Sequence, residues 1–110
     1  MPSAKIDINT GLLDADVKII IESARQIPEI EQLVLFGSRA KGAYKKGSDI
    51  DLAIKGQLAN YDTAITLSTI LNEEKSLPYF FDVVNYNTIA EPKLLEHIDR
   101  VGVILFERES

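Results

Sequence analysis

A glycine-serine pair and two aspartates stand close together in this chain. Residues 37–52 read Gly-Ser-Arg-Ala-Lys-Gly-Ala-Tyr-Lys-Lys-Gly-Ser-Asp-Ile-Asp-Leu, so that Asp49 and Asp51 follow the pair by about a dozen residues. Alternate residues of an extended strand project to the same face, with α-carbons about 7 Å apart. Two carboxylates in that arrangement suit one hard cation. The pattern therefore predicts metal-assisted phosphoryl chemistry.

A third acid, Asp82, lies inside the aromatic and β-branched segment 79–85. We expect this segment to be a strand beside the one that carries Asp49 and Asp51. A buried carboxylate without a partner is costly, so Asp82 should have a partner or a cation. Three acids on adjacent strands can bind two magnesium ions about 3.5–4 Å apart, the arrangement of in-line nucleotidyl transfer. The structural alternatives are an edge-strand position or a salt bridge for Asp82, and a solvated sheet face for Asp51.

The glycine-serine pair is a candidate phosphate site. If residues 38–42 begin a short helix, its free N–H groups and positive dipole end can hold a triphosphate. Ser38 adds a hydroxyl donor, and Gly37 has no β-carbon to keep a phosphate away. Arg39 and Lys41 follow on the loop, where they either contact phosphate or simply face water. An ordinary tight turn is the structural alternative for the pair.

The periodicity of apolar residues alternates between helix and strand along the chain. Helices are predicted from Asp14 or Asp16 to about residue 27, from Asn60 or Asp62 to Pro78, and from a capping box at residues 88–91 to Gly102. Strands are predicted at 33–36, 48–54, 79–85 and 103–106. This order favours an α/β (α+β) domain, a small mixed β-sheet flanked by helices. Within the second strand, the side chains of Ile50, Leu52 and Ile54 should face the core and those of Asp49, Asp51 and Ala53 the site.

Composition and charge narrow the function further. The chain has 110 residues, 45% of them hydrophobic, which fits a single domain over 1–110 with a loosely held lead-in at 1–11. The N-terminus lacks the apolar segment of a signal peptide, and no run of about 20 apolar residues occurs, so we expect a cytoplasmic protein. Without cysteine, only oxygen-rich sites remain, and these suit magnesium. The net charge of −5 argues against direct nucleic-acid binding.

These motifs together resemble the minimal nucleotidyltransferase family of the DNA polymerase β-like superfamily. The residues that carry the resemblance are Gly37-Ser38-Arg39-Ala40-Lys41-Gly42, then Ser48-Asp49-Ile50-Asp51-Leu52, then Asp82 before two valines. The resemblance implies the polymerase β-like palm fold, with Asp49, Asp51 and Asp82 as catalytic metal ligands for magnesium, two ions in all. It implies ATP as substrate, with phosphate contacts assigned to Gly37, Ser38, Arg39, Lys41 and Ser48.

Short, freestanding members of that family resemble MntA-type antitoxins. For such a protein the resemblance implies a helical HEPN-domain ribonuclease toxin as partner, silenced by transfer of AMP to one of its tyrosines. Two other hypotheses remain open: a nucleotide-binding antitoxin that acts by complex formation alone, and a nucleotidyltransferase with a small-molecule acceptor. His97, the only histidine, has no matching cluster in the sequence and is predicted to be structural, as are the strand aromatics Tyr79, Phe80 and Phe81.

Overall fold

The computed structural model describes residues 10–45 and 47–109. Nearly all of the predicted lead-in, 1–11, lies outside the described residues. The described elements are α1 (Asp14–Arg25), β1 (Gln32–Phe36), α2 (Gly37–Lys41), β2 (Ile50–Lys55), α3 (Tyr61–Thr69), η1 (Ile70–Glu74), β3 (Phe81–Asn85), η2 (Tyr86–Thr88), α4 (Pro92–Val101) and β4 (Val103–Glu107). Each predicted helix and strand has a counterpart, so the fold class is confirmed.

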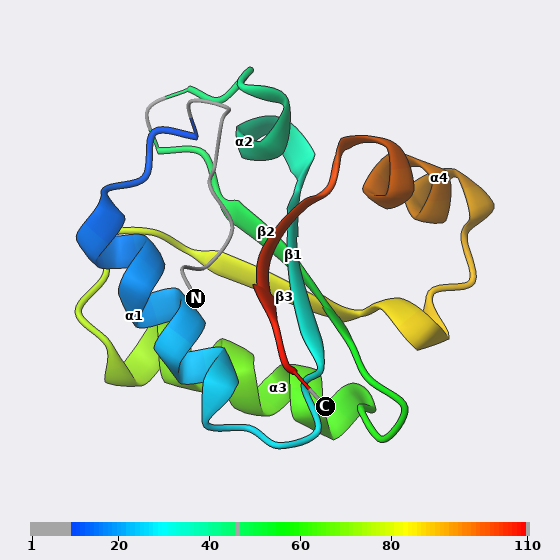
Figure 1. Cartoon of the computed structure of the whole chain (residues 1–110). Helices are drawn as coiled ribbons and strands as arrows, with labels where there is room; N and C mark the ends of the chain where they lie inside the picture. The colour runs from blue at the N-terminus through cyan, green and yellow to red at the C-terminus, as the bar shows by residue number, and fades with distance from the viewer. Residues whose placement is uncertain (1–9, 46, 110) are drawn as a thin grey trace.

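Four strands form one mixed sheet in the order β3-β2-β1-β4. β1 pairs antiparallel with both β2 and β4, and β2 pairs parallel with β3. A parallel pair requires a crossover connection, which here contains α3. Figure 1 shows the strands crossing the centre of the molecule with helices around them. Because β2 and β3 run in the same direction, the N-terminal ends of both strands lie at the same end of the sheet.

The helix ends differ from the sequence prediction in three places. Leu13 is the N-cap of α1, and the two acids predicted to cap it lie in the first turn, where they face the positive helix dipole. Asn60 does cap α3, but this helix ends at Thr69 and continues as the π-helical turn η1. Glu91 is itself the N-cap of α4, so the predicted capping box at 88–91 is wrong. Among the described residues, no helix is long and apolar enough to cross a membrane.

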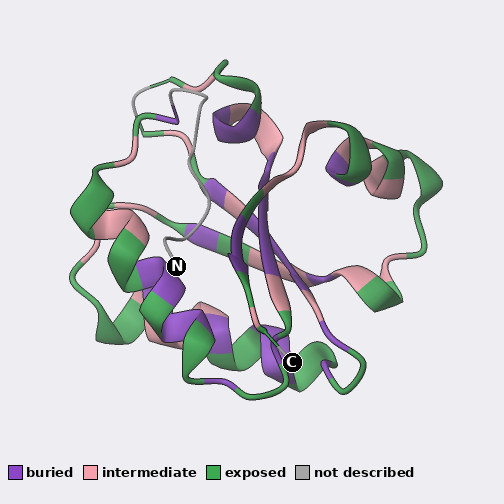
Figure 2. Cartoon of the chain, viewed as in Figure 1, coloured by how far each residue is buried: buried purple, intermediate pink, exposed green. Residues whose placement is uncertain are grey.

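The alternation of side chains along β1 and β2 creates two cores, one on each face of the sheet. The larger core joins the strands to α1 and α3 through Ile20, Ala24, Leu33, Leu35, Ile50, Leu52, Ile54 and Leu67. The smaller one joins the opposite face to α4 through Val34, Phe36, Ala53 and Ile98. Figure 2 shows the buried strand positions at the centre of the fold. The predicted division of β2 into an apolar face and a second face is therefore confirmed, and the second face has a small core of its own.

Candidate active site

Two acids face each other across the parallel pair β2 and β3. Asp51 pairs in register with Asp82, and Asp51 also lies opposite Phe36 of β1. Neighbouring strands are about 4.8 Å apart, and residues in register share a face, so both carboxylates extend on the α4 side of the sheet. Asp49 precedes β2 and is exposed. The structure thus places Asp51 and Asp82 side by side, with Asp49 two residues before Asp51 in the chain.

The environment of Asp82 differs from the prediction. Its side chain is exposed, not buried, because β3 is an edge strand of the sheet. Phe80, predicted to be a core residue, is 58% exposed, whereas Phe81 is fully buried. The Asn72 side chain accepts from the Phe81 N–H at 2.8 Å and donates to the Phe81 carbonyl at 2.9 Å. This pair of hydrogen bonds anchors the outer edge of β3 immediately before Asp82.

The surroundings of Asp51 perturb its carboxyl group. Partial burial raises the pKa of its carboxyl group, and the negative charges of Asp82 and Asp49 raise that pKa further. A positive charge on the His97 imidazole, in its protonated form, would lower that pKa. Crowded carboxylates that repel one another are a common feature of cation sites, because a bound cation removes the repulsion. The electrostatics therefore favour Asp51 as the centre of the site.

Gly37 lies against Asp51 at the start of α2. Its φ of +79° belongs to the left-handed region, and a β-carbon built on it would overlap the Asp51 carboxylate. Glycine is therefore required twice, for its backbone conformation and for the space beside the acid. α2 begins at Gly37, as expected for a short helix after the turn, and Ser38 is half-buried in its first turn.

His97 of α4 also belongs to this site, although the sequence analysis had predicted a structural role for it. Its Nε2 atom accepts a hydrogen bond from the Gly37 N–H at 3.2 Å. Its ring meets the Phe36 ring edge to face, with centroids 6.0 Å apart. One signal could have indicated this placement: His97 follows Leu94 by three residues and precedes Val101 by four, so it lies on the apolar stripe that faces the sheet.

Arg39 takes a different place from the one predicted. Only 3% of the residue is exposed, and its guanidinium donates to the Thr10 carbonyl at 2.7 Å and to the Ser48 carbonyl at 3.0 and 3.2 Å. The rings of Tyr44 and Tyr79 flank it at 5.0 and 5.1 Å. A triphosphate contact does not match this placement. The guanidinium instead ties α2 to the residue that precedes Asp49.

The remaining predicted phosphate contacts lie around the loop between α2 and β2. Lys41, at the end of α2, is exposed and can reach an anion. Ser48 is half-buried, and its hydroxyl oxygen accepts from the Lys45 N–H at 2.8 Å. This hydrogen bond gives Ser48 a role in shaping the loop. Of the five predicted contacts, only Lys41 is exposed; Gly37, Ser38 and Ser48 are half-buried, and Arg39 is buried. The N–H of Gly37 is donated to His97.

The donor set suits a hard divalent cation in its chemistry. Asp49, Asp51 and Asp82 offer only carboxylate oxygens, the ligands that magnesium prefers. Within residues 10–45 and 47–109, however, no three acidic or imidazole side chains are arranged closely enough to form a ready-made metal cluster. The raised pKa of Asp51 is the observation that supports cation binding. The carboxylate chemistry of these residues therefore suits such an ion, while their described positions do not form a complete coordination site.

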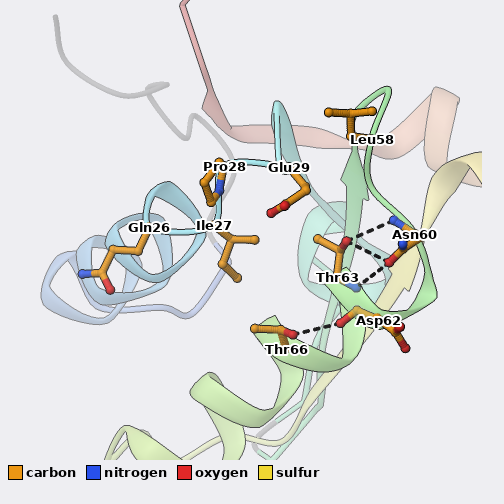
Figure 3. A pocket seen from close by; sticks show the side chains of 9 residues that line it. All are labelled: Gln26, Ile27, Pro28, Glu29, Leu58, Asn60, Asp62, Thr63 and Thr66. Atoms are coloured by element: carbon orange, nitrogen blue, oxygen red, sulfur yellow. Dashed lines mark hydrogen bonds between the residues drawn. The ribbon is translucent and has the colours of Figure 1, made fainter.

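A surface hollow of about 510 Å³ lies elsewhere, between the end of α1 and the start of α3. Figure 3 shows the nine residues that line it. They precede β1 or follow β2, whereas the acids lie where β1 ends and β2 begins. The hollow is thus at the opposite end of the strands and has no part in the acid site.

Comparison with known proteins identifies the fold and the family. Residues 18–110 match the family described as polymerase beta, nucleotidyltransferase. No curated protein matches the chain. Among solved structures, a toxin-antitoxin with AMP-PNP is similar at 22% identity and a TM-score of 0.67, covering 89% of this chain and 76% of that one.

Two further structures show the same fold. The toxin-antitoxin MntA-HepT is 22% identical with a TM-score of 0.66, covering 87% of this chain and 74% of its own. A protein from Sulfolobus solfataricus whose crystal structure is assigned to a nucleotidyltransferase is 23% identical with a TM-score of 0.54, covering 98% of this chain and 93% of that one. With the acids, the glycine-serine turn and the mixed sheet in place, the family match leads to one conclusion: this chain belongs to the polymerase beta nucleotidyltransferase family.

Proposed function

We propose that this nucleotidyltransferase is a magnesium-dependent protein adenylyltransferase that transfers AMP from ATP to a tyrosine hydroxyl of a HEPN ribonuclease toxin, and so acts as its antitoxin. The observation that carries the proposal is the register of Asp51 opposite Asp82, beside a glycine that only fits without a side chain. The similarity to toxin-antitoxin structures, one of them with AMP-PNP, supports the choice of partner and nucleotide.

The transfer makes one bond and breaks one bond. The acceptor oxygen bonds to the α-phosphorus of ATP. The bond from that phosphorus to the oxygen between the α- and β-phosphates breaks, and pyrophosphate leaves with that oxygen. The acceptor proton passes to a base, for which Asp82 is the candidate because it is the exposed acid next to Asp51. Asp49, Asp51 and Asp82 would hold magnesium, which supplies charge neutralisation of the triphosphate.

The proposal is tested by transfer of label from α-labelled ATP to a co-purified HEPN partner. Asp49→Asn and Asp51→Asn should each lower transfer by about a hundredfold or more, as loss of an electrostatic stabiliser typically does. Asp62→Asn is the matched control, because Asp62 is an exposed acid in the first turn of α3, at the other end of the strands. Undiminished transfer by the Asp49 and Asp51 variants would overturn the proposal.

Two outcomes of the same assay identify the competing hypotheses. If both variants still neutralise the toxin without transferring label, the chain acts by complex formation. If label is transferred to small molecules and not to the protein, the acceptor is a metabolite. Mass spectrometry of the partner distinguishes these outcomes directly, because each transferred AMP adds one nucleotide unit to its mass.

A further inference from the structure

The backbone of the Gly37–Ser38 turn has no side chain at Gly37 to restrain it. Gly37 must lack a side chain because the Asp51 carboxylate occupies that space, and its φ of +79° is one that glycine adopts readily but is not held to. Side-chain packing cannot restrain a residue without a side chain. Any restraint on Gly37 must therefore act through its backbone.

His97 supplies such a restraint. The N–H groups in the first turn of a helix have no acceptor within the helix. For the Gly37 N–H, the acceptor is the Nε2 atom of His97, 3.2 Å away on a different element, α4. To accept at Nε2, the neutral imidazole carries its proton on Nδ1. The bond thus links the turn to a helix that is itself anchored in the smaller core.

The ring that accepts this bond is itself held in place. His97 is half-buried, and its ring meets the edge of Phe36, the residue just before Gly37. The next residue on the same helix, Ile98, is 2% exposed and packs with Phe36 and Ala53. The imidazole is therefore held against the end of β1, directly before the Gly37–Ser38 turn.

We propose that His97 is a positioning residue for the nucleotide-binding turn, holding the Gly37 amide through Nε2 so that the turn keeps one orientation beside Asp51. This inference rests on the proposed function, in which the turn binds the phosphates of ATP. It assigns to His97 an effect on nucleotide affinity and no part in the chemical step.

Three variants separate the hydrogen bond from the ring. His97→Leu removes the acceptor and keeps an apolar group beside Phe36, and it should weaken binding of AMP-PNP with magnesium by roughly tenfold, the typical value of one hydrogen bond. His97→Gln places an amide oxygen near the position of Nε2 and should restore most of the affinity. Lys93→Ala, an exposed change on the same helix, should leave affinity unchanged. In transfer assays, His97→Leu should raise KM for ATP more than it lowers kcat.

A measurement on the unaltered chain tests the hydrogen bond without relying on any variant. Nitrogen NMR should show His97 Nε2 unprotonated, with a scalar coupling across the hydrogen bond to the Gly37 amide nitrogen. Absence of that coupling, full affinity in His97→Leu, or failure of His97→Gln to restore affinity would each overturn the inference. If the unaltered chain binds no AMP-PNP, the proposed function fails as well. If it binds and His97→Leu binds equally, only the inference fails.

Discussion

The two faces of the sheet are formed by the same strands but differ in what they carry: one face is packed in the larger core, and the other carries the acids. On the face covered by α1 and α3, the side chains of Leu33, Leu35, Ile50, Leu52 and Ile54 are all fully buried. On the face toward α4, a core of four buried residues fills only part of the surface, and Asp51 and Asp82 extend beyond it. Because side chains alternate along a strand, one segment of six residues contributes both to the larger core and to the candidate active site.

Residues that stabilise the fold and residues of the candidate site are neighbours in the chain, but their side chains lie on opposite faces of the sheet. Asp51 and Leu52 are chain neighbours, yet one is half-buried among carboxylates and the other is in the larger core. A change at one should leave the property served by the other largely intact.

The largest effect is expected on the sealed face. Leu52→Ala should lower the free energy of unfolding by about 2–5 kcal/mol, because it leaves a cavity where the side chain is fully buried. Chemical denaturation measures the loss, and Ile65→Ala on the exposed side of α3 is the control that should change stability little. A loss below about 1 kcal/mol at Leu52 would mean that this face is less tightly packed than the structure shows.

The second prediction concerns Gly37, which lies against the Asp51 carboxylate. Gly37→Ala should lower the free energy of unfolding by about 1–2 kcal/mol through its left-handed backbone, and should also abolish transfer by displacing Asp51. Gly47→Ala is the matched control: its φ is +86°, but within the described part of the chain no atom beyond its sequence neighbours lies within 4 Å of the added β-carbon. It should show a similar loss of stability with transfer retained. Equal transfer by both variants would contradict the close contact between Gly37 and Asp51.

The smallest effect is an increase in the free energy of unfolding, expected for Asp51→Asn. Because the pKa of Asp51 is raised in the folded chain, the folded state binds its proton more tightly than the unfolded state. The contribution of Asp51 to stability is therefore present at low pH and is lost as pH rises through the raised pKa. In EDTA at neutral pH, Asp51→Asn should increase the free energy of unfolding, by no more than about 1 kcal/mol since water partly screens the carboxylate.

Denaturation curves at several pH values check this last prediction. The difference between Asp51→Asn and the unaltered chain should grow from acid to neutral pH and then level off. Magnesium should reduce it, because a bound cation offsets the repulsion from Asp49 and Asp82. A variant that is less stable than the unaltered chain at every pH would show that the carboxylate is a net stabiliser of the fold.

Local patterns in the sequence were sufficient to predict the acid-bearing strand correctly. Alternation along β2 separated Asp51 from Leu52, and the run from Leu33 to Phe36 before a glycine predicted where β1 ends and α2 begins. These features depend on neighbours within a few residues. Capping was predicted less well: Leu13 is an N-cap without a side-chain hydrogen bond, and the Glu91 carboxylate caps α4 by accepting from the Lys93 N–H.

Placement of single side chains depended on contacts between distant segments. Arg39 resembled a phosphate ligand in the sequence, but carbonyls of Thr10 and Ser48 and two aromatic rings enclose it in the fold. His97 resembled an isolated structural histidine, yet it contacts Gly37 across 60 positions of the chain. No local pattern encodes such partners, because each is created when helices dock on the sheet.

Residue types and period-two spacing are enough to predict three acids, a glycine-serine turn, and an alternation in β2 that turns Asp51 away from the larger core. Tertiary packing is needed to show that β3 is an edge strand with Asp82 exposed, that Asp51 and Asp82 are in register, and that α4 brings a histidine to Gly37. Strand order and helix docking are set by the packing of the whole chain, which no short segment contains.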